Sequence, residues 1–67
     1  MAEEQIELAA FELPYRRKAA IRRVTFDSGM TMARLVLREG TRITQVDLDA
    51  ETALKLGEAL VAAAREL

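Results

Sequence analysis

The chain has 67 residues, of which 51% are hydrophobic, and its formal net charge is -1. It contains neither cysteine nor histidine, which excludes disulfides, thiol nucleophiles, histidine-based triads and most zinc sites. A chain this short forms a single domain, residues 1–67, whose core alone gives little net stability. We therefore expect a homodimer without metal or cofactor, in which a second copy completes the core.

The N-terminal segment, MAEEQIELAA, has no basic residue ahead of an apolar run. A signal peptide needs both features, and a membrane-spanning helix needs about 20 consecutive apolar residues. We therefore expect neither, and we expect a protein of the cytoplasm. The lack of cysteine agrees with a reducing compartment.

The first element, residues 6–13, can be interpreted in two ways. Its glutamate, alanine and leucine content is typical of a helix, on which Ile6 and Ala10 would share one face. Pro14 instead favours extended backbone in the residue before it, and the apolar residues alternate if one slip occurs at Ala9-Ala10. We favour a strand with a bulge, and the helix stays as the alternative.

Two short turn sequences divide the middle of the chain into strands. Asp27-Ser28-Gly29 and Glu39-Gly40 are typical of tight turns, because glycine adopts positive φ without steric cost. The segments around them are rich in strand-forming residues. The three further strands are expected over residues 18–27, 30–38 and 41–48. Because short turns join antiparallel strands, the four strands should form an antiparallel meander.

The last segment, residues 50–66, has the period of an amphipathic helix, and Asp49 is its expected N-cap. Its apolar residues occupy about half of the helical circumference, more than the ~100° stripe that a simple surface helix needs. Leu54 and Val61, at the margin of this arc, are the predicted dimer contacts. Gly57 inside the arc predicts a close approach of the helix to the sheet or to the helix of a second copy.

The predicted fold class is therefore α+β, a four-stranded antiparallel β-meander covered by one C-terminal α-helix and assembled as a homodimer. No serine or threonine has a general base at a recognisable spacing. Asp47 and Asp49 are interpreted as a strand end and a helix cap rather than as an acid and base pair. We therefore predict no catalytic residue and no enzymatic activity.

Basic residues concentrate in the middle of the chain. Between Arg16 and Arg42 eight basic residues accompany two acidic ones, whereas both ends of the chain are acidic. Four arginines are expected on the sheet face away from the helix, where they would suit a partner protein or the phosphates of a single-stranded nucleic acid. These candidate contact residues are Arg22, Arg34, Arg38 and Arg42. The alternative is that they pair across strands with Glu7, Glu12 and Glu39.

Residues 28–60 carry a pattern that runs from a turn glycine through an Arg-Glu-Gly corner to a helix that contains glycine. The residues of the pattern are Gly29, Arg38-Glu39-Gly40, Leu48-Asp49, Thr52-Ala53 and Gly57. This pattern resembles a group of short bacterial proteins with a domain of unknown function. The resemblance implies the meander and helix, and it implies no assigned activity or catalytic residue.

A looser similarity in architecture is to the β-β-β-β-α modules of the Whirly proteins and the purine-rich-element-binding (PUR) repeats. Those modules dimerise and bind single-stranded DNA or RNA, so the similarity implies the same for this chain. The sequence thus leads to two functional hypotheses. The first is a protein-interaction or structural module that acts as a homodimer, with an unknown protein partner. The alternative is a single-stranded nucleic-acid-binding module that uses the central arginines.

Overall fold

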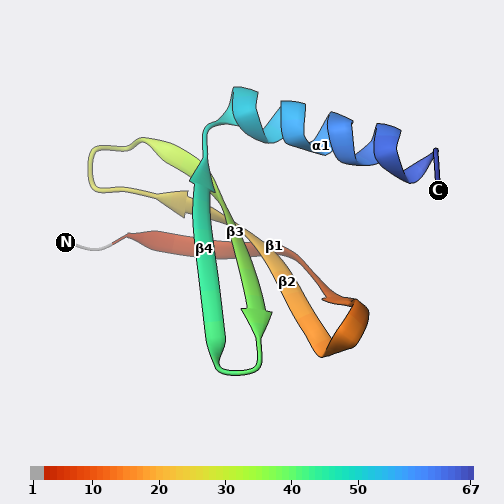
Figure 1. The fold of residues 1–67 in the computed structure, drawn as a ribbon. Helices are drawn as coiled ribbons and strands as arrows, with labels where there is room; N and C mark the ends of the chain where they lie inside the picture. The colour runs from red at the N-terminus through yellow and green to blue at the C-terminus, as the bar shows by residue number, and fades with distance from the viewer. Residues whose placement is uncertain (1–2) are drawn as a thin grey trace.

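The computed structural model describes residues 3–67. Four strands, β1 (Glu4–Leu13), β2 (Arg17–Thr25), β3 (Thr31–Glu39) and β4 (Arg42–Leu48), precede one helix, α1 (Ala50–Ala64). The strands form a single antiparallel sheet in the order β1-β2-β3-β4 (Figure 1). The α+β class and the antiparallel meander are therefore confirmed, and the first segment is a strand rather than a helix.

Glycines at positive φ close two of the three hairpins. Gly29 has φ 92° between β2 and β3, and its amide donates a hydrogen bond to the Phe26 carbonyl at 2.8 Å. Gly40 has φ 61° in the short loop between β3 and β4. Both conformations are strained for residues that carry a Cβ atom, so the two glycines select these turns.

The connection between β1 and β2 adopts the same left-handed conformation without a glycine. It is a short 3-10 segment, Pro14–Arg16, in which Tyr15 has φ 65° and Arg16 has φ 63°. The Arg17 guanidinium lies 5.9 Å from the centre of the Tyr15 ring, within the range of a cation–π contact. Left-handed backbone costs about 1–2 kcal/mol for a residue other than glycine, so this turn is strained.

The bulge predicted in β1 exists, but it lies one residue before the expected slip. The pairing between β1 and β2 shifts between Glu7 and Ala9, which leaves Leu8 as the extra residue. This position brings Ile6 and Ala9 to the same side of the sheet, because Leu8 drops out of the alternation. The apolar residues on either side of the bulge therefore share one face.

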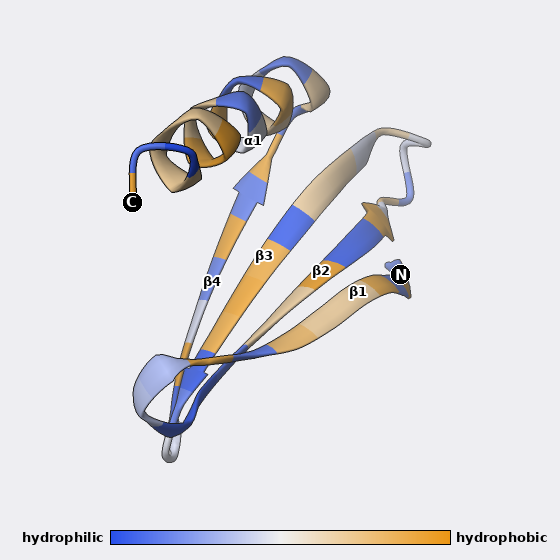
Figure 2. Cartoon of the chain, turned by 90° about the vertical axis from the view of Figure 1, so that its right-hand side faces the viewer, coloured by the Kyte–Doolittle hydropathy of each residue, from blue (hydrophilic) through white to orange (hydrophobic). Residues whose placement is uncertain are grey.

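The strand register divides the sheet into two faces, since directly paired residues point to the same side. The apolar face carries Ile6, Ala9, Phe11, Leu13, Ala19, Ile21, Ala33, Leu35, Leu37, Val46 and Leu48. The polar face carries Gln5, Glu7, Ala10, Glu12, Lys18, Ala20, Arg22, Val24, Met32, Arg34, Val36, Arg38, Ile43, Gln45 and Asp47. Hydropathy along the strands alternates accordingly (Figure 2).

The core of the described chain is very small. Among residues 3–67 the buried hydrophobic side chains are Ala19, Val24 and Val36, and Val24 alone is fully buried. Val24 and Val36 belong to the polar face, so Ala19 is the one buried member of the apolar face. The face with more apolar residues is therefore the less covered one.

The prediction that the helix covers the sheet is wrong for the single chain. α1 contacts chiefly β3 and β4, near its own start, and then runs clear of the sheet (Figures 1 and 2). Asp49 is the one residue between β4 and α1, and it already caps the helix, so the chain has no loop that would let α1 fold back. In the described part of the chain no helix has the length and apolar character needed to cross a bilayer.

Candidate interaction surfaces

The start of α1 is held by its cap. The Asp49 carboxylate accepts a hydrogen bond from the Thr52 amide at 2.9 Å, which satisfies one of the free N–H groups of the first turn. The same hydrogen bond lowers the pKa of Asp49. This cap fixes where the helix begins and, through the short connection, the direction in which it leaves the sheet.

The helix surface is the apolar side of α1, and it is largely exposed. It consists of Ala53, Leu54, Leu56, Gly57, Leu60, Val61 and Ala64. Leu54 is 63% exposed and Leu60 is 62% exposed, and Val61 is also exposed. Both predicted dimer contacts, Leu54 and Val61, therefore lie open on the surface of the single chain.

Gly57 marks a shallow hollow of about 520 Å³ on the helix surface, between Leu54 and Val61. A Cβ atom added to Gly57 would meet no atom within 4 Å. The predicted close approach of Gly57 to the sheet is thus absent within the chain. The approach of a second copy to this glycine stays a prediction.

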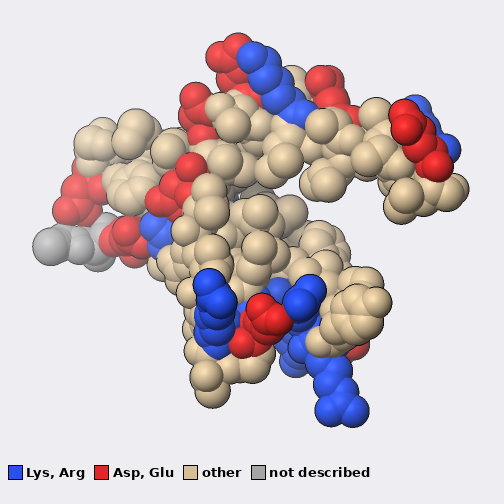
Figure 3. All heavy atoms as spheres, in the orientation of Figure 1, with Lys and Arg blue, Asp and Glu red and all other residues tan. Residues whose placement is uncertain are grey.

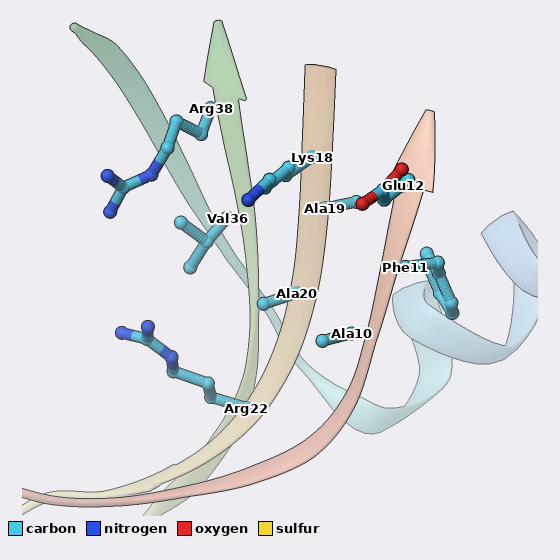
Figure 4. Close-up of a pocket in the computed structure, with 9 residues that line it drawn as sticks. All are labelled: Ala10, Phe11, Glu12, Lys18, Ala19, Ala20, Arg22, Val36 and Arg38. Carbon is cyan, nitrogen blue, oxygen red and sulfur yellow. The ribbon is translucent and has the colours of Figure 1, made fainter. Parts of the chain in front are cut away.

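The apolar face of the sheet is the second uncovered surface. Phe11 is 50% exposed, and Ile6 and Val46 are also exposed. The space-filling view shows α1 projecting beyond the sheet, with uncharged residues along the side of the helix that faces the sheet (Figure 3). The Phe11 side chain points to the same side of the sheet as α1, away from the charged residues of the polar face (Figure 4). Two apolar surfaces of one chain therefore lie open without covering each other.

The four predicted arginine contacts do not form one group. Arg22, Arg34 and Arg38 lie on the polar face, as expected. Arg42, the first residue of β4, pairs with Glu39 and lies on the apolar face, which contradicts its predicted position. Arg42 directly follows the two-residue turn after Glu39, and this pairing sets its side of the sheet.

Arg34 is occupied by carboxylates. Its guanidinium binds both oxygens of Asp47, at 2.7 and 3.0 Å, and Glu3 at 2.9 Å. These hydrogen bonds raise the pKa of Arg34, and the bond to Arg34 lowers the pKa of Asp47. The sequence predicted that the arginines pair with glutamates, and it did not indicate Asp47. The register places Asp47 directly opposite Arg34. Arg34 is therefore a structural ion-pair residue rather than an open contact.

Three other cations, together with Glu12, line a hollow of about 410 Å³ on the polar face. Lys18, Arg22 and Arg38 rise around a floor that includes Ala20 and Val36 (Figure 4). None of the three has a carboxylate oxygen within 4.0 Å among residues 3–67, and Arg22 donates only to the Gln5 amide oxygen, at 3.2 Å. Lys18 was not among the four predicted contact residues, although the register pairs it directly with Arg38.

Residues 2–66 match a family of unknown function, DUF6967. The chain belongs to this family. The resemblance to proteins with a domain of unknown function is thereby confirmed. Searches of curated proteins and of solved structures gave no match.

Membership of DUF6967 assigns no activity. In the part of this DUF6967 chain that the structure describes, no three acidic, histidine or cysteine residues gather in a metal-binding arrangement. The features that remain are the helix surface, the apolar face of the sheet and the hollow around Lys18, Arg22 and Arg38.

Proposed function

We propose that this DUF6967 chain is a non-enzymatic protein-interaction or structural module that acts as a homodimer. The observation that carries the proposal is the combination of a very small core and two solvent-exposed apolar surfaces. Among residues 3–67, Ala19, Val24 and Val36 are buried, whereas the leucines of the helix surface are exposed. Folding has to offset a conformational entropy of about 1–2 kcal/mol per residue, which such a core does not supply.

Covering the open surfaces supplies the missing stabilisation. Burying one exposed leucine or valine side chain contributes about 1.5–3 kcal/mol. Leu54, Leu60 and Val61 are each more than half exposed, and so is Leu8 in β1. A second copy is the economical partner, because one two-fold contact buries the same patch on both chains.

The proposal is tested by charging the helix surface. We expect the variant carrying both Leu54→Glu and Val61→Glu to sediment as a monomer, because two buried carboxylates oppose assembly strongly. The unmodified chain should sediment with the mass of a dimer at the same concentration. Analytical ultracentrifugation measures both, and circular dichroism reports whether the variant keeps its secondary structure.

The matched control is Lys55→Glu, which places one carboxylate on the charged side of α1. It removes the exposed contact of Lys55 with Glu51, at 3.6 Å, which is worth only a few tenths of a kcal/mol. The control should remain a dimer. A monomeric mass for the unmodified chain over the accessible concentration range would overturn the proposal.

A second function, single-stranded nucleic-acid binding, is supported by the hollow on the polar face. Lys18 and Arg38 are like charges in directly paired positions, which is destabilising and which a bound anion would relieve. Glu12 of β1 pairs directly with Lys18 from the other side and offsets part of this repulsion. Arg22 adds a third cation on the same side. Phosphates of an extended strand would satisfy these groups, with Ala20 and Val36 as an apolar floor.

This second function predicts salt-dependent binding of a labelled oligonucleotide. Fluorescence anisotropy at about 50 and 200 mM salt should show affinity that falls with salt, because phosphate contacts release counterions. Replacing Lys18 and Arg38 by Glu should abolish the signal, whereas Arg65→Glu at the C-cap of α1 should leave it intact. Equal binding by both variants would remove the hollow as the site.

A further inference from the structure

The connection between β4 and α1 is one residue long and sets the direction in which the helix leaves the sheet. β4 ends at Leu48, α1 begins at Ala50, and the single residue between them, Asp49, is committed to the cap. The carbonyl of Asp49 also accepts the first helical hydrogen bond, from the Ala53 amide at 2.9 Å. With no free residue at this corner, the helix departs in one direction and its far half projects beyond the sheet (Figure 1).

The dimensions of α1 nevertheless match those of the sheet. Its 15 residues make a helix about 22 Å long, at about 1.5 Å per residue. Four strands spaced about 4.8 Å apart make a sheet roughly 15–19 Å wide. A helix of this length crosses the whole sheet, so α1 is suited to covering an apolar face like that of its own chain.

We propose that the two copies of the dimer exchange helices, so that α1 of each copy lies across the apolar face of the partner's sheet. The inference rests on the homodimer proposed above and specifies its geometry. Each chain offers one open helix and one open sheet face. One two-fold exchange covers all four surfaces, whereas a foreign helix docked on the sheet would leave α1 uncovered.

The helix surface has the shape needed for such packing. Ala53, Gly57 and Ala64 provide small side chains along one side, and a Cβ atom at position 57 would have no atom within 4 Å. Leu56 and Leu60 lie along one edge of this strip and provide the bulk that packs between the side chains of a sheet. A sheet approaching from the partner would fill this space.

Charge complementarity favours the same arrangement. Arg23 and Arg42 lie on the apolar face of the sheet by their register, and neither has a carboxylate oxygen within 4.0 Å among residues 3–67. The charged side of helix α1 carries Glu51 and Glu58, and of these Glu51 lies 3.6 Å from Lys55 on the same side. An exchanged helix would therefore set acidic residues near cations of the partner's sheet, and the acidic C-terminal part of the chain against its basic middle.

Intermolecular cross-linking tests the exchange directly, because the native chain has no cysteine. One preparation carries Leu60→Cys on α1 and a second carries Leu35→Cys on the apolar face. After the two are mixed and re-equilibrated, a short bismaleimide should join the different chains. The control preparation carries Gln45→Cys on the polar face, and its mixture with Leu60→Cys should give no such product.

The outcomes separate the exchange from the dimer itself. A dimeric mass with Leu60→Cys linking only to itself would show a helix-to-helix contact and overturn the exchange alone. A monomeric mass of the unmodified chain would overturn both proposals.

A second measurement avoids substitution at packed positions. In a mixture of ¹³C-labelled and unlabelled chains of native sequence, isotope-filtered NOESY detects only contacts between copies. The exchange predicts intermolecular cross-peaks between the Leu60 methyl groups and the Phe11 ring. Dimers in which such helix-to-sheet cross-peaks are absent would overturn the exchange.

Discussion

At the scale of single residues, the turn between β1 and β2 holds the clearest local strain. Tyr15 and Arg16 both have φ near +60°, and Tyr15 is almost fully exposed. Nothing in the sequence Pro14–Arg16 signals this conformation, because the residues that usually adopt it are glycine, asparagine and aspartate. The paired ends Leu13 and Arg17 impose it through the strand register.

The strain predicts a stabilising substitution. Arg16→Gly removes a left-handed penalty of about 1–2 kcal/mol but adds about 0.5–1 kcal/mol of unfolded-state entropy. We expect a net gain of about 0.5–1 kcal/mol in the free energy of unfolding, measured by urea denaturation. Thr41→Gly, in a turn where the native φ is not positive, is the control and should give no gain. A loss of stability for Arg16→Gly would contradict this account.

Arg34 shows how charge at one position depends on the register. The sequence places it among the arginines of the basic middle, as a candidate contact for phosphate or protein. Pairing with Asp47 and Glu3 neutralises it, and the open cations are instead Lys18, Arg22 and Arg38. Glu3 is 31 residues away in sequence, so no local pattern could have indicated this partner.

At the scale of elements, the corner between β4 and α1 decides the shape of the molecule. Asp49 ends the strand, caps the helix and leaves no flexible residue between them. The sequence correctly indicated both the cap and the helix, since Asp49 precedes a periodic apolar run. It did not indicate that a one-residue link would hold the helix clear of the sheet, because that depends on the angle at the corner.

The cap predicts a pH-dependent contribution to stability. The pKa of Asp49 is lowered in the folded state by the hydrogen bond from Thr52, so the contribution is present above the pKa of the unfolded chain. It is lost as pH falls through the lower folded pKa. We therefore expect Asp49→Ala to have a lower Tm than the native chain near neutral pH.

This difference in Tm should shrink on acidification to about pH 2, where the native carboxylate is protonated as well. Thermal melts followed by circular dichroism at both pH values measure it. Asp49→Asn serves as the control, because it keeps a capping oxygen that does not titrate. A difference that stays constant with pH would mean that the charged cap is not the cause.

At the scale of the whole molecule, the chain consists of a twisted sheet and a projecting helix with little core between them. The proposed dimer would bury the exposed apolar surfaces that the small core leaves uncovered. The variant with Leu54→Glu and Val61→Glu should therefore separate the two copies. The proposed exchange of helices specifies where each helix lies in the dimer. The polar face would remain outside such a dimer, so the hollow around Lys18, Arg22 and Arg38 stays accessible. Self-association and nucleic-acid binding are therefore compatible.

The sequence by itself determined the strands, their two glycine turns, the helix and its cap. These features depend on residues close together in the chain: alternation along strands, positive φ at Gly29 and Gly40, and the side-chain oxygen of Asp49. Tertiary structure alone decided that Arg34 meets Asp47 and Glu3, that Arg42 changes face, and that α1 leaves its own sheet uncovered. These outcomes depend on the register between strands and on the angle at one corner, which bring together or separate residues distant in the sequence.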